Sequence, residues 1–410
     1  MSETSNSVTE SPSKRLGQIE FIALMGILFA SVAFSIDAML PALPQIAAEL
    51  IPAAPNSAQL IITSFIIGMG IGTLLAGPLS DSFGRRTIIV VGAGLYVLGA
   101  VVAWAGQSLE MVLLGRAIQG LGAAGPRVVA LAIVRDLYEG RQMARIVSFA
   151  MMVFTLVPAV APLIGSLIIA EFGWRSIFPA FIIFSVLSVG WLVLRQPETL
   201  PKSKRRPFSF APFRRAVIEV MSHRAVALSI ATQTLIYGML FGAIASVQPI
   251  FDITFNRAEA FPYWFGALAL ICAIPSLVNA AIVVRFGMRR LIRTALLVQC
   301  LISAVALLAM TALPFGIDAQ FFIYYIWTVC LFSMLGFTIG NLNALALQPM
   351  GHIAGTASSV MSATATLLGG ALGAPLGLAF NGTPIPLAAG ILVLGLIAWG
   401  LMRIMPETLD

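Results

Sequence analysis

The stretch FIALMGILFASVAFSIDAMLPALP, residues Phe21 to Pro44, decides the fold, because it is long and apolar enough to cross a lipid bilayer as a helix. It contains a single carboxylate, Asp37. A charged side chain at the centre of a bilayer costs about 3 kcal/mol, so such a residue normally faces protein or a water-filled path. We predict that Asp37 is functional. The alternative is a residue at the outer interface, or a cap for the turn before Pro41.

Composition indicates a membrane protein along the whole chain. Hydrophobic residues make up 59% of the 410, charged residues make up 10%, and the mean hydropathy is +0.97. Soluble globular domains are far less apolar. Apolar runs of about 18 residues or more recur, which is typical of spanning helices, whereas a β-barrel has short segments of alternating polarity. The predicted fold class is an all-α polytopic membrane protein.

Apolar runs separated by polar loops predict twelve membrane spans. The longest polar interruption, residues 196–224, divides them six and six. The predicted spans are 19–41, 58–79, 87–106, 109–134, 144–170, 174–195, 225–250, 262–284, 291–313, 319–348, 354–380 and 384–404.

This division predicts two pseudo-symmetric six-helix bundles, and short echoes between the halves support it. The letters PETL follow the sixth span at 197–200 and the twelfth at 406–409, while FGRR at 83–86 and FGMRR at 286–290 follow the second and eighth. Paired halves are a hallmark of secondary transporters, whose substrate site lies between them. The predicted order is a disordered cytoplasmic tail at 1–18, an N-terminal bundle at 19–195, a cytoplasmic linker at 196–224, a C-terminal bundle at 225–405 and a cytoplasmic tail at 406–410.

Basic residues set the predicted orientation. If both termini are cytoplasmic, all of the 24 Lys and Arg lie in or beside cytoplasmic segments except Arg116, Arg127, Arg175 and Arg257. Positive residues favour the inner side of a membrane. The basic residues that give the net charge of +7 therefore lie along the inner side of the lipid bilayer, and the charge does not indicate binding of nucleic acid. We expect a monomeric, multi-pass protein of a bacterial inner membrane.

The loop GPLSDSFGRR, residues 77–86, combines two glycines for a chain reversal with Asp81, Arg85 and Arg86. It resembles the cytoplasmic signature of the major facilitator superfamily, although Ser82 stands where that family usually has a basic residue. The resemblance implies a cytoplasmic gating motif made of Gly77, Asp81, Gly84, Arg85 and Arg86. The alternative is a generic turn on the positively charged side of the membrane.

The fourth span carries Arg116, Gln119 and Arg127, which the helical period places on nearly one face. Arg116 and Asp37 lie at similar predicted depths, which is compatible with an ion pair or with a shared cavity. The stretch resembles the span-four signature of the same superfamily. That resemblance implies that Arg116 takes part in substrate or proton handling, and we take Gln119 and Arg127 as candidates for the substrate cavity.

Gly120 to Gly125, GLGAAG, matches a dinucleotide-binding pattern by letter, but no strand precedes it. Small residues that let helices approach closely explain it better, as they do Gly369, Gly373 and Gly377. No phosphate-binding GxxxxGK[ST] occurs, and no nucleophile and base pair or metal cluster stands out. We therefore expect no enzyme activity, no metal site and no cofactor, with a proton gradient as the energy source.

Pro158, Pro162 and Gly165 lie inside the fifth span, where prolines create bends that gating helices can use. This stretch resembles the glycine and proline signature of the drug:proton antiporter branch, with Ala161 and Ser166 in place of two glycines. Together with the first and fourth spans, GWRSIF at 173–178 and AGTASSVMS at 354–362, the chain is similar to the Bcr/CflA multidrug-efflux group.

The spans of the second half carry neutral polar groups instead of charges near mid-membrane. Gln233, Tyr237 and Phe241 follow one another at four-residue steps, and Asn341 and Asn343 lie in the tenth span. They are candidates for a substrate wall. The alternative for each is hydrogen bonding between packed spans.

The resulting hypothesis is proton-coupled alternating access, with Asp37 and Arg116 in proton coupling. Proton entry down the membrane potential would drive export of a neutral or weakly charged amphipathic compound, which binds when Asp37 is deprotonated and leaves when Asp37 is protonated. One alternative is a symporter that imports a small metabolite with the same carboxylate. A second is a membrane receptor or structural protein with no flux.

Overall fold

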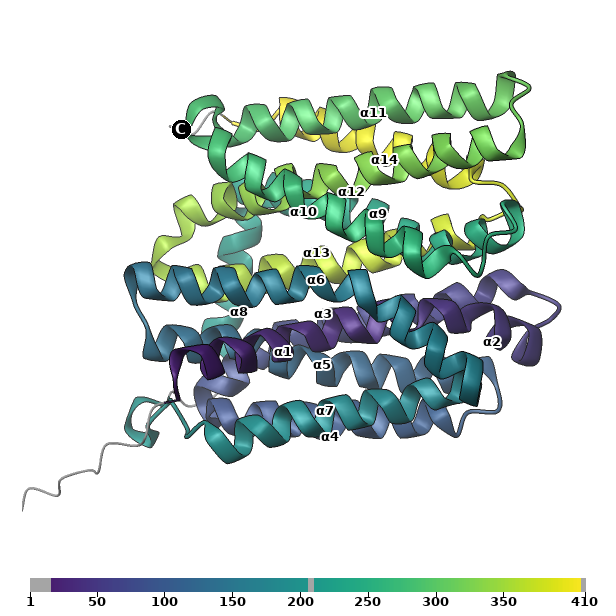
Figure 1. Ribbon diagram of the computed structural model, residues 1–410. Coiled ribbons are helices and arrows are strands. Elements are labelled where there is room, and N and C mark those ends of the chain that lie inside the picture. Colours follow the sequence, from purple (N-terminus) through teal and green to yellow (C-terminus); the bar gives the residue numbers. More distant parts are fainter. Residues whose placement is uncertain (1–15, 206–209, 407–410) are drawn as a thin grey trace, which may run out of the picture.

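The computed structural model describes residues 16–205 and 210–406, and every regular element in these ranges is a helix (Figure 1). Most of the two predicted tails, 1–18 and 406–410, lies outside the described residues. The α-helices are α1 Gln18–Asp37, α2 Leu43–Leu50, α3 Leu60–Phe83, α4 Arg85–Trp104, α5 Leu109–Leu137, α6 Gly140–Phe172, α7 Ile177–Arg195, α8 Phe210–Ser222, α9 Arg224–Pro249, α10 Phe261–Phe286, α11 Met288–Ala312, α12 Ile317–Leu347, α13 Ala354–Leu378 and α14 Ile385–Arg403.

Eleven helical stretches in the described residues are long and apolar enough to cross a membrane. One of them, Ile317–Leu378, contains both α12 and α13, which meet at a 3₁₀ segment where Met350 leaves helical geometry. The prediction of a multi-pass helical membrane protein is confirmed. The first predicted span, 19–41, ends too early, because the apolar helical stretch continues from Gln18 through a break after Asp37 to Leu50.

The long helices run side by side, and most neighbours belong to the same half of the chain (Figure 1). In the first half α5 packs against α3 and α4, and in the second half α9 packs against α13 and α14. The largest contacts between the halves are those of α3 with α13 and of α6 with α10. These two contacts hold the halves side by side.

Glycine allows the closest of these approaches, as the sequence predicts for GLGAAG. A Cβ atom on Gly120 of α5 would lie 2.0 Å from the carbonyl oxygen of Phe65 in α3, and one on Gly369 of α13 would lie 2.5 Å from the Cβ of Tyr237 in α9. No side chain fits at such distances, so these glycines serve helix packing.

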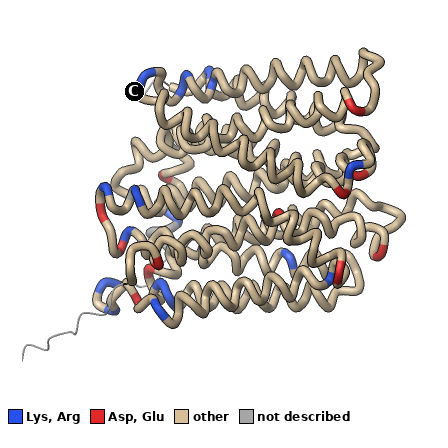
Figure 2. Tube along the Cα trace, viewed as in Figure 1, with Lys and Arg blue, Asp and Glu red and all other residues tan. Residues whose placement is uncertain are grey.

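Basic side chains gather at one end of the helices, which we call the basic end (Figure 2). The described residues nearest the two termini also lie there, together with the short helix α8 (Figure 1). The opposite end, which we call the far end, has few basic residues, among them Arg175 beside Glu49 and Arg257 beside Asp318. The predicted separation of charge along the helices is therefore present in the structure.

Two turns at the basic end reproduce the echo between the halves. Gly84 joins α3 to α4 with φ +102°, and Gly287 joins α10 to α11 with φ +77°. Side chains rarely tolerate these positive φ values, so glycine is what lets each helix end and the next begin one residue later.

Candidate functional site

Asp37 is the last residue of α1 and is 5% exposed. It is the twentieth residue of the helix, about 30 Å from the start of α1, and the apolar stretch continues to Leu50 beyond it. No described residue donates a hydrogen bond to its carboxylate or forms an ion pair with it. Asp37 is therefore a buried acid that has no partner among the described residues and lies within the first apolar stretch.

Arg116 is fully buried in α5 but does not pair with Asp37. Its Nη1 donates to Gln119 Oε1 at 2.7 Å, its Nη2 donates to the carbonyl oxygen of Ser35 at 2.9 Å, and its guanidinium lies over the Phe65 ring. Of the two alternatives that the sequence left open, the ion pair is thus wrong for this structure. Arg116 reaches the residue two positions before Asp37 and makes neutral contacts there.

Tyr96 of α4 joins this group, and sequence reasoning missed it. Its Oη lies 2.6 Å from Ser35 Oγ, and both side chains are buried. Ser35 therefore connects a tyrosine hydroxyl and a guanidinium to the turn of α1 directly before Asp37. No pattern in the sequence indicated the contact, because 61 residues separate the two side chains.

Arg127 faces α3 like Arg116, as the helical period predicts, but it lies in a different environment. Its Nη1 lies 3.7 Å from Met69 Sδ in α3. Arg127 also lines a cavity of about 620 Å³, which we call the large cavity. Helices α3 and α5 supply one wall, and residues 351–362, from the end of the 3₁₀ segment into the start of α13, supply the other. The large cavity therefore lies between the halves, with the exposed Arg135 and His352 at its rim.

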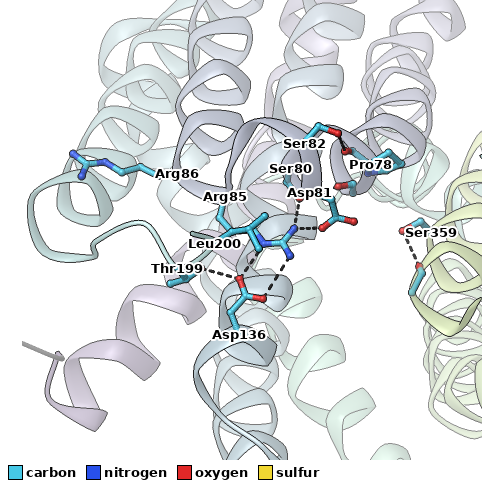
Figure 3. A network of polar contacts seen from close by, with 12 residues as sticks. Pro78, Ser80, Asp81, Ser82, Arg85, Arg86, Asp136, Thr199, Leu200 and Ser359 are labelled. Carbon is cyan, nitrogen blue, oxygen red and sulfur yellow. Dashed lines mark hydrogen bonds and ion pairs between the residues drawn. The ribbon is translucent and has the colours of Figure 1, made fainter. Parts of the chain in front are cut away.

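The predicted gating motif borders the large cavity at the basic end. Arg85 is 8% exposed and binds Asp81 at 2.5 Å, Asp136 at 3.0 Å and Ser80 Oγ at 2.7 Å (Figure 3). Gly77 lies beside Ser359 of α13, which is labelled in the same view. Arg85 thus joins Asp81 and Asp136 in a charged network within the first half, and the loop meets the second half at Gly77.

Residues 198 and 199, from the first PETL, complete this network. The carboxylate of Glu198 accepts hydrogen bonds from the backbone N–H groups of Arg85 and Arg86 at 3.0 and 3.1 Å. A carboxylate at these positions caps α4 and is favoured by the positive end of the helix dipole. Thr199 Oγ1 donates to Asp136 at 2.8 Å. Sequence reasoning noted the PETL echo but assigned no role to Glu198, Thr199 or Asp136.

The far end is closed by direct contacts between the halves. Asn56 Nδ2 donates to the carbonyl oxygens of Leu378 and Phe380, at 3.2 and 2.6 Å, and Ser246 Oγ donates to Gln59 Oε1 at 3.5 Å. The cleft that remains here has a volume of about 50 Å³. In this structure the space between the halves is therefore accessible from the basic end.

The candidates in the second half do not line the large cavity. Asn341 of α12 exchanges amide hydrogen bonds with Asn279 of α10, at 2.8 and 3.4 Å, so its role here is packing between helices. Gln233 is fully buried with its Nε2 3.5 Å from Tyr237 Oη, and the Tyr237 ring contacts Phe241. Asn343 is partly buried.

The proline-containing stretch of α6 contacts both α1 and α10. The helix continues through Pro158 and Pro162. A Cβ on Gly165 would lie 2.2 Å from the carbonyl oxygen of Ala38, and one on Gly266 of α10 would lie 2.7 Å from the carbonyl oxygen of Ala159. Movement of this part of α6 would therefore displace Ala38, the residue next to Asp37.

A multi-pass helical protein with a polar cavity between paired halves has the architecture of a membrane transporter. The chain belongs to the Major Facilitator Superfamily, whose family model matches residues 25–374. It is 29% identical to a bicyclomycin resistance protein homolog of Haemophilus influenzae, over 86% of this chain and 87% of that protein. It is 30% identical to the multidrug resistance protein MdtL of Shewanella oneidensis, over 80% of each. The fold also matches a crystal structure of a D-xylose-proton symporter, with a TM-score of 0.74, 16% identity and coverage of 95% of this chain and 98% of the other.

Proposed function

We propose that the protein is a proton-coupled drug antiporter that exports small amphipathic compounds across a bacterial inner membrane by alternating access. The observation that carries the proposal is Asp37, a nearly fully buried carboxylate that has no partner among the described residues and lies at the end of α1, within the apolar stretch Gln18–Leu50. An ionisable residue at such a position normally serves an ion or proton path. The names of the two curated relatives, which refer to drug resistance, support export of drugs.

The architecture that we propose has twelve spans in two six-helix bundles, 19–195 and 225–405. In this count α12 and α13 are separate spans, because Met350 interrupts the helix between them. The basic end faces the cytoplasm, together with both termini and the linker 196–224, since basic residues favour that side. The described state is then open toward the cytoplasm through the large cavity. We propose a monomer as the transporting unit.

Opening and closing of the two ends gives Asp37 alternate surroundings. A buried carboxyl without an ionic partner is more stable neutral than charged, while contact with water favours the carboxylate. Asp37 therefore binds or releases a proton when a path opens between it and the water on one side of the membrane. Arg116 holds the backbone of Ser35 and so fixes the position of this turn, which makes it a positioning residue for Asp37. The Arg85 network and the Asn56 contacts at the far end are the proposed gates.

Transport in inside-out membrane vesicles tests the proposal. A susceptibility panel in an efflux-deficient bacterial strain first identifies an exported compound. In vesicles with an acid interior, the wild type should accumulate this compound and release protons from the vesicle as it does so. Exit of the compound from the vesicle together with the protons would favour the importing symporter. Binding without any flux would favour a receptor.

A further inference from the structure

The large cavity carries an excess of positive charge. Its charged lining residues are Asp81, Arg85, Arg127, Arg135 and Asp136. Both acids bind the same arginine, Arg85. Arg127 and Arg135 are therefore left without an acidic partner among the described residues. His352, which also lines the cavity, already contacts Glu219 of α8 at 2.7 Å.

Arg127 is the deeper of the two arginines without an acidic partner. It lies eight residues before Arg135 on α5, about 12 Å farther from the basic end. Its side chain is partly buried, whereas Arg135 is exposed at the rim. The contact of Arg127 with Met69 Sδ uses a weak acceptor, so most of the five N–H donors of the guanidinium remain available. A guanidinium of this kind favours a carboxylate, sulfonate or phosphate group.

The opposite wall of the cavity also suits an anion. It contains the hydroxyls of Thr356, Ser358 and Ser362, each of which can donate a hydrogen bond, while the Ser359 hydroxyl already donates to the carbonyl oxygen of Gly355 at 3.2 Å. Helix α13 begins in this wall at Ala354 without a side-chain cap, and a helix start favours negative charge. Neither feature defines a site alone. Together with Arg127 they indicate that both walls of the cavity favour an anionic group.

We propose that Arg127 binds the acidic group of the transported compound, with the hydroxyls of α13 facing it, and that the substrates are amphipathic organic anions. The inference rests on the proposed function. A cavity of about 620 Å³ lies within the range that accepts drug-sized molecules. Phe29, Val128 and Met151 supply apolar lining for the rest of such a molecule. Exchange of an anion moving out for a proton moving in also transfers net positive charge inward, so the membrane potential assists export.

A matched pair of probes tests the anion site in the purified full-length protein. 2-Naphthalenesulfonate is permanently charged, and 2-naphthalenesulfonamide has nearly the same shape without the charge. Fluorescence titration should show tighter binding of the sulfonate by about tenfold or more, as expected for charge-assisted hydrogen bonds. Arg127→Gln should remove this preference, so that the two probes bind with similar affinity, while Arg127→Lys should retain part of it.

The control is Arg293→Gln, the same change at an exposed arginine of α11 that does not line the large cavity. It should bind both probes like the wild type. Equal binding of the two probes by the wild type would overturn the inference. So would a preference for the sulfonate that survives Arg127→Gln.

Vesicle transport of the same probes separates this inference from the proposed function. Inside-out vesicles should accumulate both probes when their interior is acidified. Collapse of the membrane potential should slow uptake of the sulfonate more than uptake of the sulfonamide. If the sulfonamide is transported by the proton gradient but binding shows no Arg127-dependent preference for the sulfonate, the proposed antiporter function stands and the anion site is overturned. Binding that depends on Arg127, with no proton-driven transport of either probe, would retain the anion site and overturn the antiporter.

Discussion

The turn between α3 and α4 and the turn between α10 and α11 have similar backbones but different surroundings. Both contain a glycine with positive φ, Gly84 or Gly287. The residue after the glycine is Arg85 in the first turn and Met288 in the second, and the residue three positions before is Asp81 or Val284. Glycine alone is therefore enough to form the turn, and the charged network of the first turn is not needed for the backbone conformation.

The same contrast extends to the two halves. Among the described residues, the buried charged side chains are Asp37, Arg85 and Arg116, all in the first half. Buried polar groups in the second half are amides and hydroxyls, such as Gln233 and Asn341. A proton needs a group that changes charge, while helix packing does not. We infer that coupling and gating depend on the first half, and that the second half supplies a neutral wall.

Replacement of Asp37 should give the largest effect, because it removes the group that binds the proton. A proton moving down a membrane potential of about 100 mV releases about 2.3 kcal/mol, which supports an accumulation ratio of about 50-fold. Asp37→Asn should abolish this proton-driven accumulation in vesicles and leave the protein folded in the membrane. Asp318→Asn in the second half, where the side chain is 77% exposed, is the matched control and should transport normally. Active efflux by Asp37→Asn would contradict the inference that proton coupling depends on the first half.

Removal of Arg85 should have the next largest effect, this time on stability. Arg85→Gln leaves Asp136, whose side chain is 19% exposed, without its ion pair, and Asp81 without its own. We expect a loss of about 2 kcal/mol, less than for a fully buried pair because Asp81 is half exposed. Thermal unfolding of the purified protein measures it.

Arg86→Gln is the control for this change, because the Arg86 side chain has no ion pair in the described residues and only its backbone N–H binds Glu198. It should shift the unfolding temperature little. Equal losses for the two variants would show that the charged network is not what stabilises the first turn.

The amide pair of the second half should give the smallest effect. Asn341→Leu leaves Asn279 without its partner in α12, at a cost of about 1 kcal/mol. The double variant Asn279→Leu with Asn341→Leu should recover part of that loss, because both polar groups are gone, and proton-driven transport should persist in it. Unfolding and vesicle transport of the three variants measure both effects. Loss of transport in the double variant would place function in the second half.

Much of the fold could be predicted from the sequence, because length and apolarity decide where a helix can span a membrane. The burial of Asp37 and the closeness of helices at Gly120 followed from the same reasoning. The first span was predicted too short, because Pro41 and Pro44 resemble an end and the apolar stretch resumes in α2 up to Leu50. Local signals do not show that a helix continues after a break.

The partners within the site could not be predicted in the same way. Similar depth suggested a pair between Asp37 and Arg116, but depth does not fix the direction in which a side chain points, and Arg116 instead binds Gln119 and the Ser35 carbonyl. The cap from Glu198 joins residues 113 positions apart. Its only signal was the PETL echo, which gave a position and no contact. Contacts of this kind depend on how the helices pack, which no single segment encodes.

Proton release on binding tests the central role of Asp37 most directly. The purified wild type, in weakly buffered detergent solution with a pH indicator, is mixed with a compound that it exports. If the compound binds the carrier in which Asp37 has lost its proton, binding should release protons to the solution, and Asp37→Asn should bind the compound without releasing any. Equal proton release by the two proteins would contradict the account.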